Sequence, residues 1–299
     1  MVRSPPQKIL MFPTFSDRIF VDSFSTNGMA YPGIKQDRGQ QLDCIKRRSW
    51  DVVIDAFYGS GGLTKAFLYG HSGELLIGGE VFAPLRSLYA SEIDLKGLCD
   101  RVKSDINEIG QSAFWSHIRS ALRSESVRYT DAEAFVALNN LSHGNGMRHG
   151  KSREDGVVRH NIKLAGEKLE NLYKRGAFIN PIVLAPQIIC PDWRSALMNA
   201  HGIDTIALLD PPYIKTCAIY PDEKPMLCGA PPVELAMSRS YGAIVAYNKN
   251  DLNLDFEFKQ LADRFGYSVE MTVTGWSTRY SAVSLKKEAT EAMWIFSKP

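Results

Sequence analysis

The sequence predicts an α/β protein built on a mostly parallel sheet, and three observations support this. Short apolar runs rich in β-branched residues recur along the chain, helical stretches separate most of them, and the first run ends in a glycine-rich turn. Continuous apolar strands that alternate with helices are typical of a parallel sheet covered on both faces. The length of 299 residues suits one large α/β domain, or one such domain with an inserted subdomain.

The strands are expected in seven apolar segments. These are 50–57, 86–94, part of 179–190, 204–210, 242–248, 267–275 and 292–298. The last two are close together with polar residues between them, which favours an antiparallel C-terminal hairpin on the sheet. Residues 68–84 are expected to form a small extra hairpin before the second strand.

Residues 99–180 differ from the rest because they lack a core strand until the third strand begins. Residues 120–140 have helical spacing, and 141–166 are rich in Gly, His, Arg, Lys and Asn. So polar a stretch within a compact α/β protein is typical of a functional insertion. The expected division is therefore a main domain formed by 1–98 and 181–299, with a mainly helical subdomain inserted at 99–180.

Composition narrows the class of protein. Hydrophobic residues make up 44% and charged residues 23%, which is typical of a soluble globular protein. The net charge of +2 indicates no nucleic-acid partner by itself, so such a partner would need a local basic patch. The five cysteines are scattered and form no CxxC pair, which argues against a disulfide framework and a zinc site. Without a secretory signal or an apolar run of membrane length, we expect a cytoplasmic protein with no membrane partner and no metal.

The segment DAFYGSGGLTKAF, residues 55–67, has the order strand, glycine-rich turn, helix. Glycine permits a tight turn and a close approach of ligand to backbone, and the carboxyl ends of such strands are where ligands bind. Neither GxGxxG nor GxxxxGK[ST] is present, so a nucleotide-like ligand without a bound pyrophosphate is favoured, and S-adenosylmethionine fits that description. The expected cofactor-binding residues of this turn are Asp55, Phe57, Gly59 and Gly61.

An acid after the second strand is expected to bind ribose hydroxyls in a site of this kind. Glu92 and Asp94 stand in that position if 86–94 is a strand, and Glu92 is the predicted ribose ligand. An exposed acid that merely ends a strand is the alternative for either residue taken alone.

The segment LLDPPYIKT, residues 208–216, follows the fourth expected strand. Pro211 and Pro212 stiffen the backbone and contribute no N–H to the sheet. The Asp210 carboxylate and the Pro211 carbonyl then form two acceptors beside the flat ring of Tyr213. Such a receptor fits a planar amine, and its acceptors stabilise the positive charge that develops as the nitrogen attacks a methyl group. The predicted catalytic residues are Asp210, Pro211, Pro212 and Tyr213.

Together, DAFYGSGG and DPPY resemble the amino-methyltransferases that act on nucleic acid. The order of glycine motif, acid, long insertion and DPPY resembles Dam-type DNA adenine N6-methyltransferases. The resemblance implies a Rossmann-like methyltransferase fold with a seven-stranded sheet, S-adenosylmethionine as cofactor, and double-stranded DNA as partner. YPGIK, residues 31–35, is similar to the family's aromatic-x-Gly-Gly-Lys motif, which implies cofactor contacts for Tyr31 and Lys35. CPDWRSAL, residues 190–197, resembles its acid-aromatic pair, which implies that Asp192 and Trp193 hold the cofactor's adenine.

Residues 138–166 are similar to the family's Asn-Gly-x-x-Arg … Phe-Asn-x-Pro-x-Gly segment, which belongs to the DNA target-recognition region. The implied nucleic-acid-binding residues are Asn145, Arg148, Lys151, Arg153 and Asn161. The three histidines of this segment match no usual metal-ligand spacing and are interleaved with Arg and Lys, which favours phosphate or base contact over a solvated loop. We also expect a monomer or weak dimer, and a restriction nuclease is a candidate partner.

The leading hypothesis is a site-specific DNA adenine N6-methyltransferase that flips its target base out of the duplex. Two alternatives stay open. One is methylation of another planar amine, such as RNA adenine, cytosine N4 or a protein glutamine. In related enzymes the last two sites usually have Ser or Asn in place of Asp210, so the aspartate favours adenine. The other alternative is a catalytically silent nucleic-acid-binding protein with the same fold.

Overall fold

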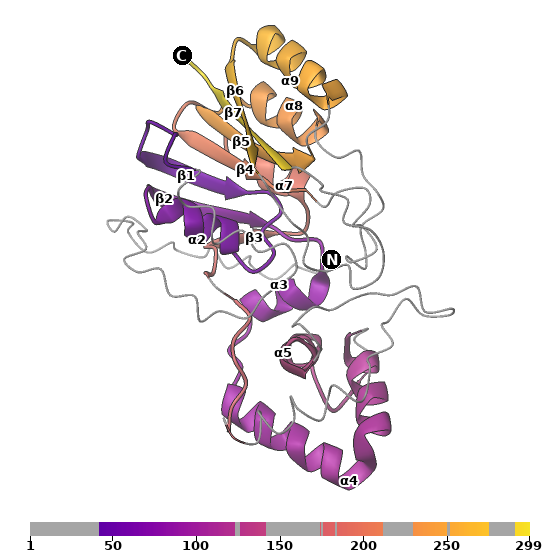
Figure 1. Ribbon diagram of the computed structural model, residues 1–299. Coiled ribbons are helices and arrows are strands. Elements are labelled where there is room, and N and C mark those ends of the chain that lie inside the picture. The colour runs from indigo at the N-terminus through magenta and orange to yellow at the C-terminus, as the bar shows by residue number, and fades with distance from the viewer. Residues whose placement is uncertain are drawn as a thin grey trace, which may run out of the picture.

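The computed structural model of this chain describes residues 42–122, 126–141, 174, 176–182, 184–211, 230–249, 252–274 and 291–299. Seven strands form one sheet in the order β3-β2-β1-β4-β5-β7-β6. Figure 1 shows the sheet with helices on both of its faces. The strands are β1 (Ser49–Asp55), β2 (Ser72–Gly79), β3 (Ile188–Cys190), β4 (Thr205–Leu209), β5 (Ala243–Lys249), β6 (Ser268–Thr274) and β7 (Glu291–Ser297).

The direction of the strands confirms the predicted fold class. β1 pairs in parallel with β2 and β4, β2 with β3, and β4 with β5, whereas β7 runs antiparallel between β5 and β6. A parallel sheet whose last strand is inserted antiparallel between the fifth and sixth is the Rossmann-like methyltransferase fold. The antiparallel C-terminal hairpin was predicted, but its position inside the sheet was not.

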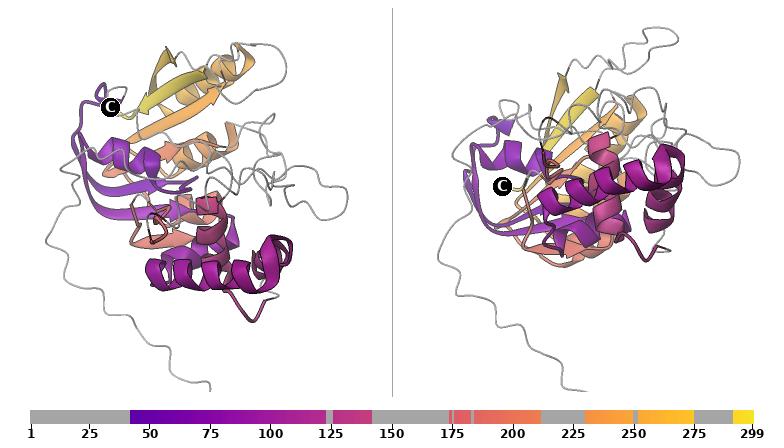
Figure 2. Two further views of the ribbon diagram at one scale, coloured as in Figure 1. Left: turned by 60° about the horizontal axis from the view of Figure 1, so that its bottom comes forward. Right: turned by 90° about the horizontal axis from the view of Figure 1, so that it is seen from below.

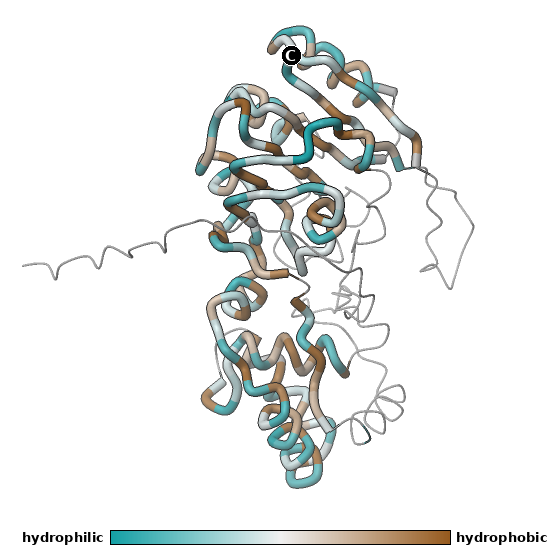
Figure 3. The backbone as a smooth tube through the Cα atoms, turned by 90° about the vertical axis from the view of Figure 1, so that its left-hand side faces the viewer, coloured by the Kyte–Doolittle hydropathy of each residue, from teal (hydrophilic) through white to brown (hydrophobic). Residues whose placement is uncertain are grey.

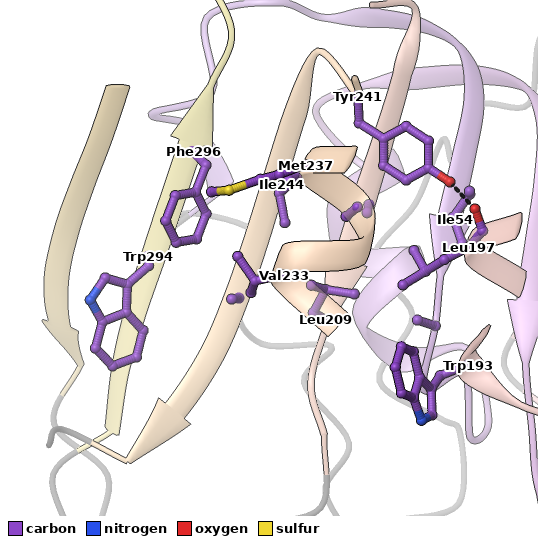
Figure 4. Packing of buried hydrophobic residues seen from close by; sticks show 14 of the residues in the cluster. Ile54, Trp193, Leu197, Leu209, Val233, Met237, Tyr241, Ile244, Trp294 and Phe296 are labelled. Carbon is purple, nitrogen blue, oxygen red and sulfur yellow. Dashed lines mark hydrogen bonds between the residues drawn. The ribbon is translucent and has the colours of Figure 1, made fainter. Parts of the chain in front are cut away.

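Helices cover both faces of the sheet. On one face α7 (Trp193–Met198), α8 (Ala230–Ser238) and α9 (Leu252–Phe265) pack on a core that includes Trp294 and Phe296. Figure 4 shows this packing, and the Tyr241 hydroxyl donates there to the carbonyl of Leu197. On the other face α2 (Gly62–Leu68) packs on a second core.

The prediction for the second strand was wrong. The strand is β2 (Ser72–Gly79), within the segment expected to be a hairpin, while 86–94 begins inside helix α3 (Ala83–Tyr89). Pro84 fits the first turn of a helix because no N–H is needed there, and Leu85 and Leu88 are three apart on its buried side. The glycines of β2 suggested a turn, but Gly79 instead allows close strand packing, since a Cβ there would lie 2.5 Å from the carbonyl oxygen of Ala56.

Helices α3, α4 (Leu95–Leu122) and α5 (Asp131–Leu141) lie between β2 and β3 in the sequence. Gly110, with φ 79°, interrupts α4. These helices share a hydrophobic core of their own that extends from Phe82 to Phe178. Figure 2 shows this helical insertion beside the sheet, and Figure 3 shows hydrophobic stretches in both parts. The core of the insertion thus begins before residue 99, the start expected from composition.

Candidate active site

Four neighbouring parallel strands each lead into a carboxylate. Asp55 ends β1, Glu80 follows β2, Asp192 follows β3, and Asp210 follows β4. Because β3, β2, β1 and β4 are adjacent and parallel, the four groups lie at the carboxyl edge of the sheet. In open α/β sheets this edge is where ligands bind. The structure therefore brings the glycine turn and the first residues of DPPY to one edge, as the sequence predicted.

Asp55 is 1% exposed and begins the glycine turn. Its Oδ1 accepts the backbone N–H of Phe57 at 3.2 Å, and its Oδ2 accepts the hydroxyl of Thr64 at 2.8 Å. The pKa of Asp55 is raised to about 7, chiefly by burial and with a smaller contribution from the charge of Asp210, while the two hydrogen bonds oppose the shift. Asp55 shapes the turn through its two hydrogen bonds.

The glycine turn is held by the two strands that flank β1. The N–H of Ala56 donates to the carbonyl of Leu208 on β4, and the N–H of Tyr58 donates to the carbonyl of Gly79 on β2. Gly59 has φ 53° and Gly61 has φ 82°, which is the left-handed region that favours glycine. A Cβ at Gly61 would also lie 2.7 Å from the carbonyl oxygen of Leu184. Both glycines are thus required by the backbone path of the turn.

Glu80 is the acid that follows the second strand, and the sequence analysis missed it. Its side chain is 7% exposed, its Oε2 accepts the N–H of Gly59 at 3.1 Å, and its Oε1 accepts the N–H of Phe82 at 2.7 Å. Glu92, which was predicted for this role, is exposed and lies after helix α3 rather than after a strand. The prediction failed because the second strand was placed too late; the signal was the acid directly after the apolar run ELLIGG.

Asp192 and Trp193 follow β3 as predicted, but both have structural contacts. The Asp192 carboxylate caps α7, accepting the N–H of Ser195 at 2.7 Å and its hydroxyl at 3.1 Å. The Trp193 ring is 8% exposed, belongs to the core under α7 and α8, and lies 6.5 Å from the ring of Phe57 at 26°. Figure 4 shows Trp193 in this core. The Phe57 and Trp193 side chains are thereby brought together at the edge of the site.

Asp210 and Pro211 follow β4 directly; Asp210 is half-buried and Pro211 is buried. Leu209 is the register partner of Ala246, so Asp210 lies at the carboxyl edge between β1 and β5. The charge of Asp210 contributes to the raised pKa of Asp55 on the neighbouring strand. Several predicted residues lie outside the described part of the chain: Tyr31, Lys35, Asn145, Arg148, Lys151, Arg153, Asn161, Pro212 and Tyr213.

Two tyrosines beside the turn were also missed by the sequence analysis. The Tyr58 hydroxyl donates to the carbonyl of Leu184 at 2.9 Å, and the Tyr89 hydroxyl donates to the carbonyl of Gly59 at 2.5 Å. Burial raises the pKa of Tyr58, and the nearby charge of Asp55 adds to that effect. No motif in the sequence marks Tyr89, because its role depends on where the helical insertion packs.

Comparisons with known proteins gave only distant matches. No protein-family model matches the chain, and no curated protein matches its sequence. Among solved structures, precorrin-6y C5,15-methyltransferase of Geobacter metallireducens is similar at 8% identity and TM-score 0.37, over 91% of this chain and 94% of that one. Precorrin 8w decarboxylase of Methanobacterium thermoautotrophicum is similar at 11% identity and TM-score 0.36, over 94% and 97%.

An rRNA methylase of Streptococcus thermophilus is similar at 12% identity and TM-score 0.30, over 88% of this chain and 95% of that one. At these scores the fold rests on the order and direction of the strands. Within the described residues no group of three or more His, Cys, Asp or Glu side chains is arranged to hold a metal ion. In the same part of the chain, no helix combines the length and apolar character that a membrane span needs.

Proposed function

We propose that this chain is an S-adenosylmethionine-dependent methyltransferase that modifies the N6 amine of adenine in DNA. The observation that carries the proposal is the position of Asp210 and Pro211 after β4, at the same carboxyl edge as the glycine turn after β1 and the Glu80 carboxylate after β2. A nucleotide-like cofactor and a planar amine would then meet at one edge of the sheet.

The residues present fit such a cofactor. Gly59 and Gly61 have φ values of 53° and 82° and carry no side chain, so a ligand can approach the backbone of the turn closely. The buried Glu80 carboxylate follows β2 directly, and its oxygens are of the type that accepts hydrogen bonds from ribose hydroxyls. Phe57 offers a half-buried ring beside Trp193 for contact with a purine. When bound, S-adenosylmethionine would supply an electrophilic methyl group on its sulfonium sulfur.

The chain's own groups would orient the amine. The Asp210 carboxylate accepts one N–H of the target amine and the Pro211 carbonyl accepts the other, while Tyr213 stacks on the base. These acceptors would stabilise the positive charge on nitrogen as its bond to the methyl carbon forms and the bond from that carbon to the sulfonium sulfur breaks, leaving a neutral thioether. A proton would then pass from the nitrogen to the Asp210 carboxylate and on to solvent. Removing one preorganised acceptor of this kind costs roughly 10²- to 10³-fold in rate. Because its pKa is raised to about 7, Asp55 carries less negative charge beside Asp210 at neutral pH than an ordinary carboxylate would.

The test is methyl transfer from labelled S-adenosylmethionine to duplex DNA, followed by digestion and identification of the modified nucleoside. Wild-type protein should yield N6-methyladenine, and Asp210→Ala should reduce the rate roughly 10²-fold or more. Asp204→Ala is the matched control, because Asp204 precedes the same strand at its amino end, with a side chain 53% exposed and paired with Arg47. That variant should retain wild-type activity.

The result also separates the alternatives. Label in tRNA, in protein or at cytosine, but not at adenine of DNA, would refute the substrate. Cofactor binding without transfer to any of these acceptors would instead favour a silent nucleic-acid-binding protein. Sequencing methylated adenines in DNA from cells that express the chain would then identify the target site.

A further inference from the structure

Helix α3 presents two different faces. Leu85 and Leu88 are buried in the core of the helical insertion. Arg86 and Tyr89, also three residues apart, instead reach the carboxyl edge of the sheet. In Figure 1, α3 lies between the sheet and the helices α4 and α5. The helix is therefore a direct physical connection between the insertion and the candidate active site.

On the side of the site, α3 contacts the backbone of the glycine turn and the backbone of the segment that follows β2. The Tyr89 hydroxyl donates to the Gly59 carbonyl at 2.5 Å, and its ring packs edge-on against Tyr58 with 5.6 Å between centroids. The Arg86 guanidinium donates to the carbonyl of Glu80 at 2.8 Å and to that of Val81. Both backbone polar groups of Gly59 are therefore hydrogen-bonded: its carbonyl accepts from Tyr89, and its N–H donates to Glu80.

On the side of the insertion, α3 contacts the start of α5. The Ser87 hydroxyl donates to the Asp131 carboxylate at 2.8 Å, and the rings of Phe82 and Phe135 lie 5.8 Å apart. Tyr89 packs against the insertion core and also against the core beneath α2. An unbroken series of side-chain contacts therefore leads from α5 through α3 to the glycine turn.

We propose that Tyr89 is a positioning residue that couples occupancy of the methyl-donor site to the conformation of the helical insertion. The inference rests on the proposed function, because the ligand at the turn is the methyl donor. When the insertion moves relative to the sheet, the bond from Tyr89 to Gly59 is lost, and the turn loses one of the contacts that hold it for the ligand. By linkage, ligand at the turn then favours the docked insertion.

Hydrogen–deuterium exchange of the full chain, with and without saturating S-adenosylhomocysteine, tests this coupling. In wild-type protein the ligand should slow exchange in the turn, residues 55–68, and also in α5, Asp131–Leu141. Since the coupling is assigned to the single hydrogen bond from Tyr89 to Gly59, the slowing in α5 should be about three- to tenfold. In Tyr89→Phe the turn should still be protected at saturation, while the ligand no longer changes exchange in α5.

Two further variants separate coupling from general destabilisation. Ser87→Ala removes the contact from α3 to α5 and should abolish the ligand effect in α5 as Tyr89→Phe does. Tyr129→Phe removes a hydroxyl that donates to Asp105 inside the insertion and should preserve that effect, even if α5 exchanges faster throughout. Two results would overturn the inference but leave the proposed function intact. In one, the ligand binds to wild-type protein but slows exchange only in the turn. In the other, the ligand still slows exchange in α5 of Tyr89→Phe. Wild-type protein that does not bind S-adenosylhomocysteine would overturn the proposed function and the inference with it.

Discussion

Replacing Asp55 by asparagine should change how the stability of the protein depends on pH. Asn keeps the shape of the side chain and the pattern of contacts. Its Oδ1 can accept the N–H of Phe57, and its Nδ2 can donate to the Thr64 hydroxyl, which then reverses its role from donor to acceptor. The substitution therefore removes a buried titrating group while leaving the turn satisfied.

The magnitude follows from the pKa of Asp55, which folding raises from 3.8 to about 7, chiefly through burial. Between these two pH values the unfolded chain has released the proton while the folded chain still holds it, so raising the pH favours the unfolded state. The difference in pKa corresponds to about 4 kcal/mol of stability, present below pH 4 and lost by about pH 7. Asp55→Asn avoids this loss, so its stability relative to wild type should rise by about 4 kcal/mol across that interval.

Urea denaturation followed by far-UV circular dichroism at pH 4, 5.5, 7 and 8 measures the effect. With a slope of about 3 kcal/mol per molar urea, the difference between the two midpoints should change by roughly 1 M from pH 4 to pH 7 and stay constant above pH 8. Asp204→Asn is the control, because it replaces a largely exposed carboxylate and leaves Asp55 in place. Parallel midpoint curves for Asp55→Asn and wild type would refute the reasoning, since Asp55 would then titrate alike in both states.

Two other substitution pairs give further tests. Glu80→Gln should weaken S-adenosylhomocysteine binding about tenfold by calorimetry, because a neutral amide is a poorer acceptor for Gly59 and for ribose hydroxyls, whereas Glu92→Gln should bind as wild type does. Equal losses of affinity in the two variants would contradict the assignment of the ribose-binding role to Glu80 in place of Glu92. Gly79→Ala should cost about 3 kcal/mol or more in urea denaturation, because its Cβ would lie 2.5 Å from a backbone oxygen. Gly266→Ala, with open space but φ 70°, should cost only about 1 kcal/mol, and the reverse order would contradict the packing argument.

Much of the sheet was predictable because apolar runs in a covered parallel sheet are continuous and end in turns. The segments 50–57, 204–210 and 242–248 correspond to β1, β4 and β5 with shifts of one or two residues at their ends. The second strand was missed because β2 contains polar residues and three glycines, which look like a turn in isolation. Its glycines are explained by close contacts with Val53 of β1 and with Ala56 and Tyr58 of the turn that follows, and such contacts are not visible in the local sequence.

The candidate site was predictable where the chemistry is local. Asp55, its glycine turn and Asp210 lie in short segments that carry their own signal, and the structure brings them to one edge. Glu80 and Tyr89 were missed for different reasons. Glu80 required the correct end of β2, whereas Tyr89 required the packing of α3 against the turn, which depends on residues distant in sequence.

The helical insertion also has a consequence for the order of folding. β2 and β3 are paired neighbours, yet residues 80–187 separate them, and β3 contributes only Ile188–Cys190 to the sheet. Closing so long a loop costs entropy, and that cost falls when part of the loop is already folded. Because the insertion has its own core, which includes Phe178 near the start of β3, its collapse draws the ends of the loop together. We therefore expect the insertion to fold first, and the pairing of β3, which precedes Asp192 and Trp193, to follow.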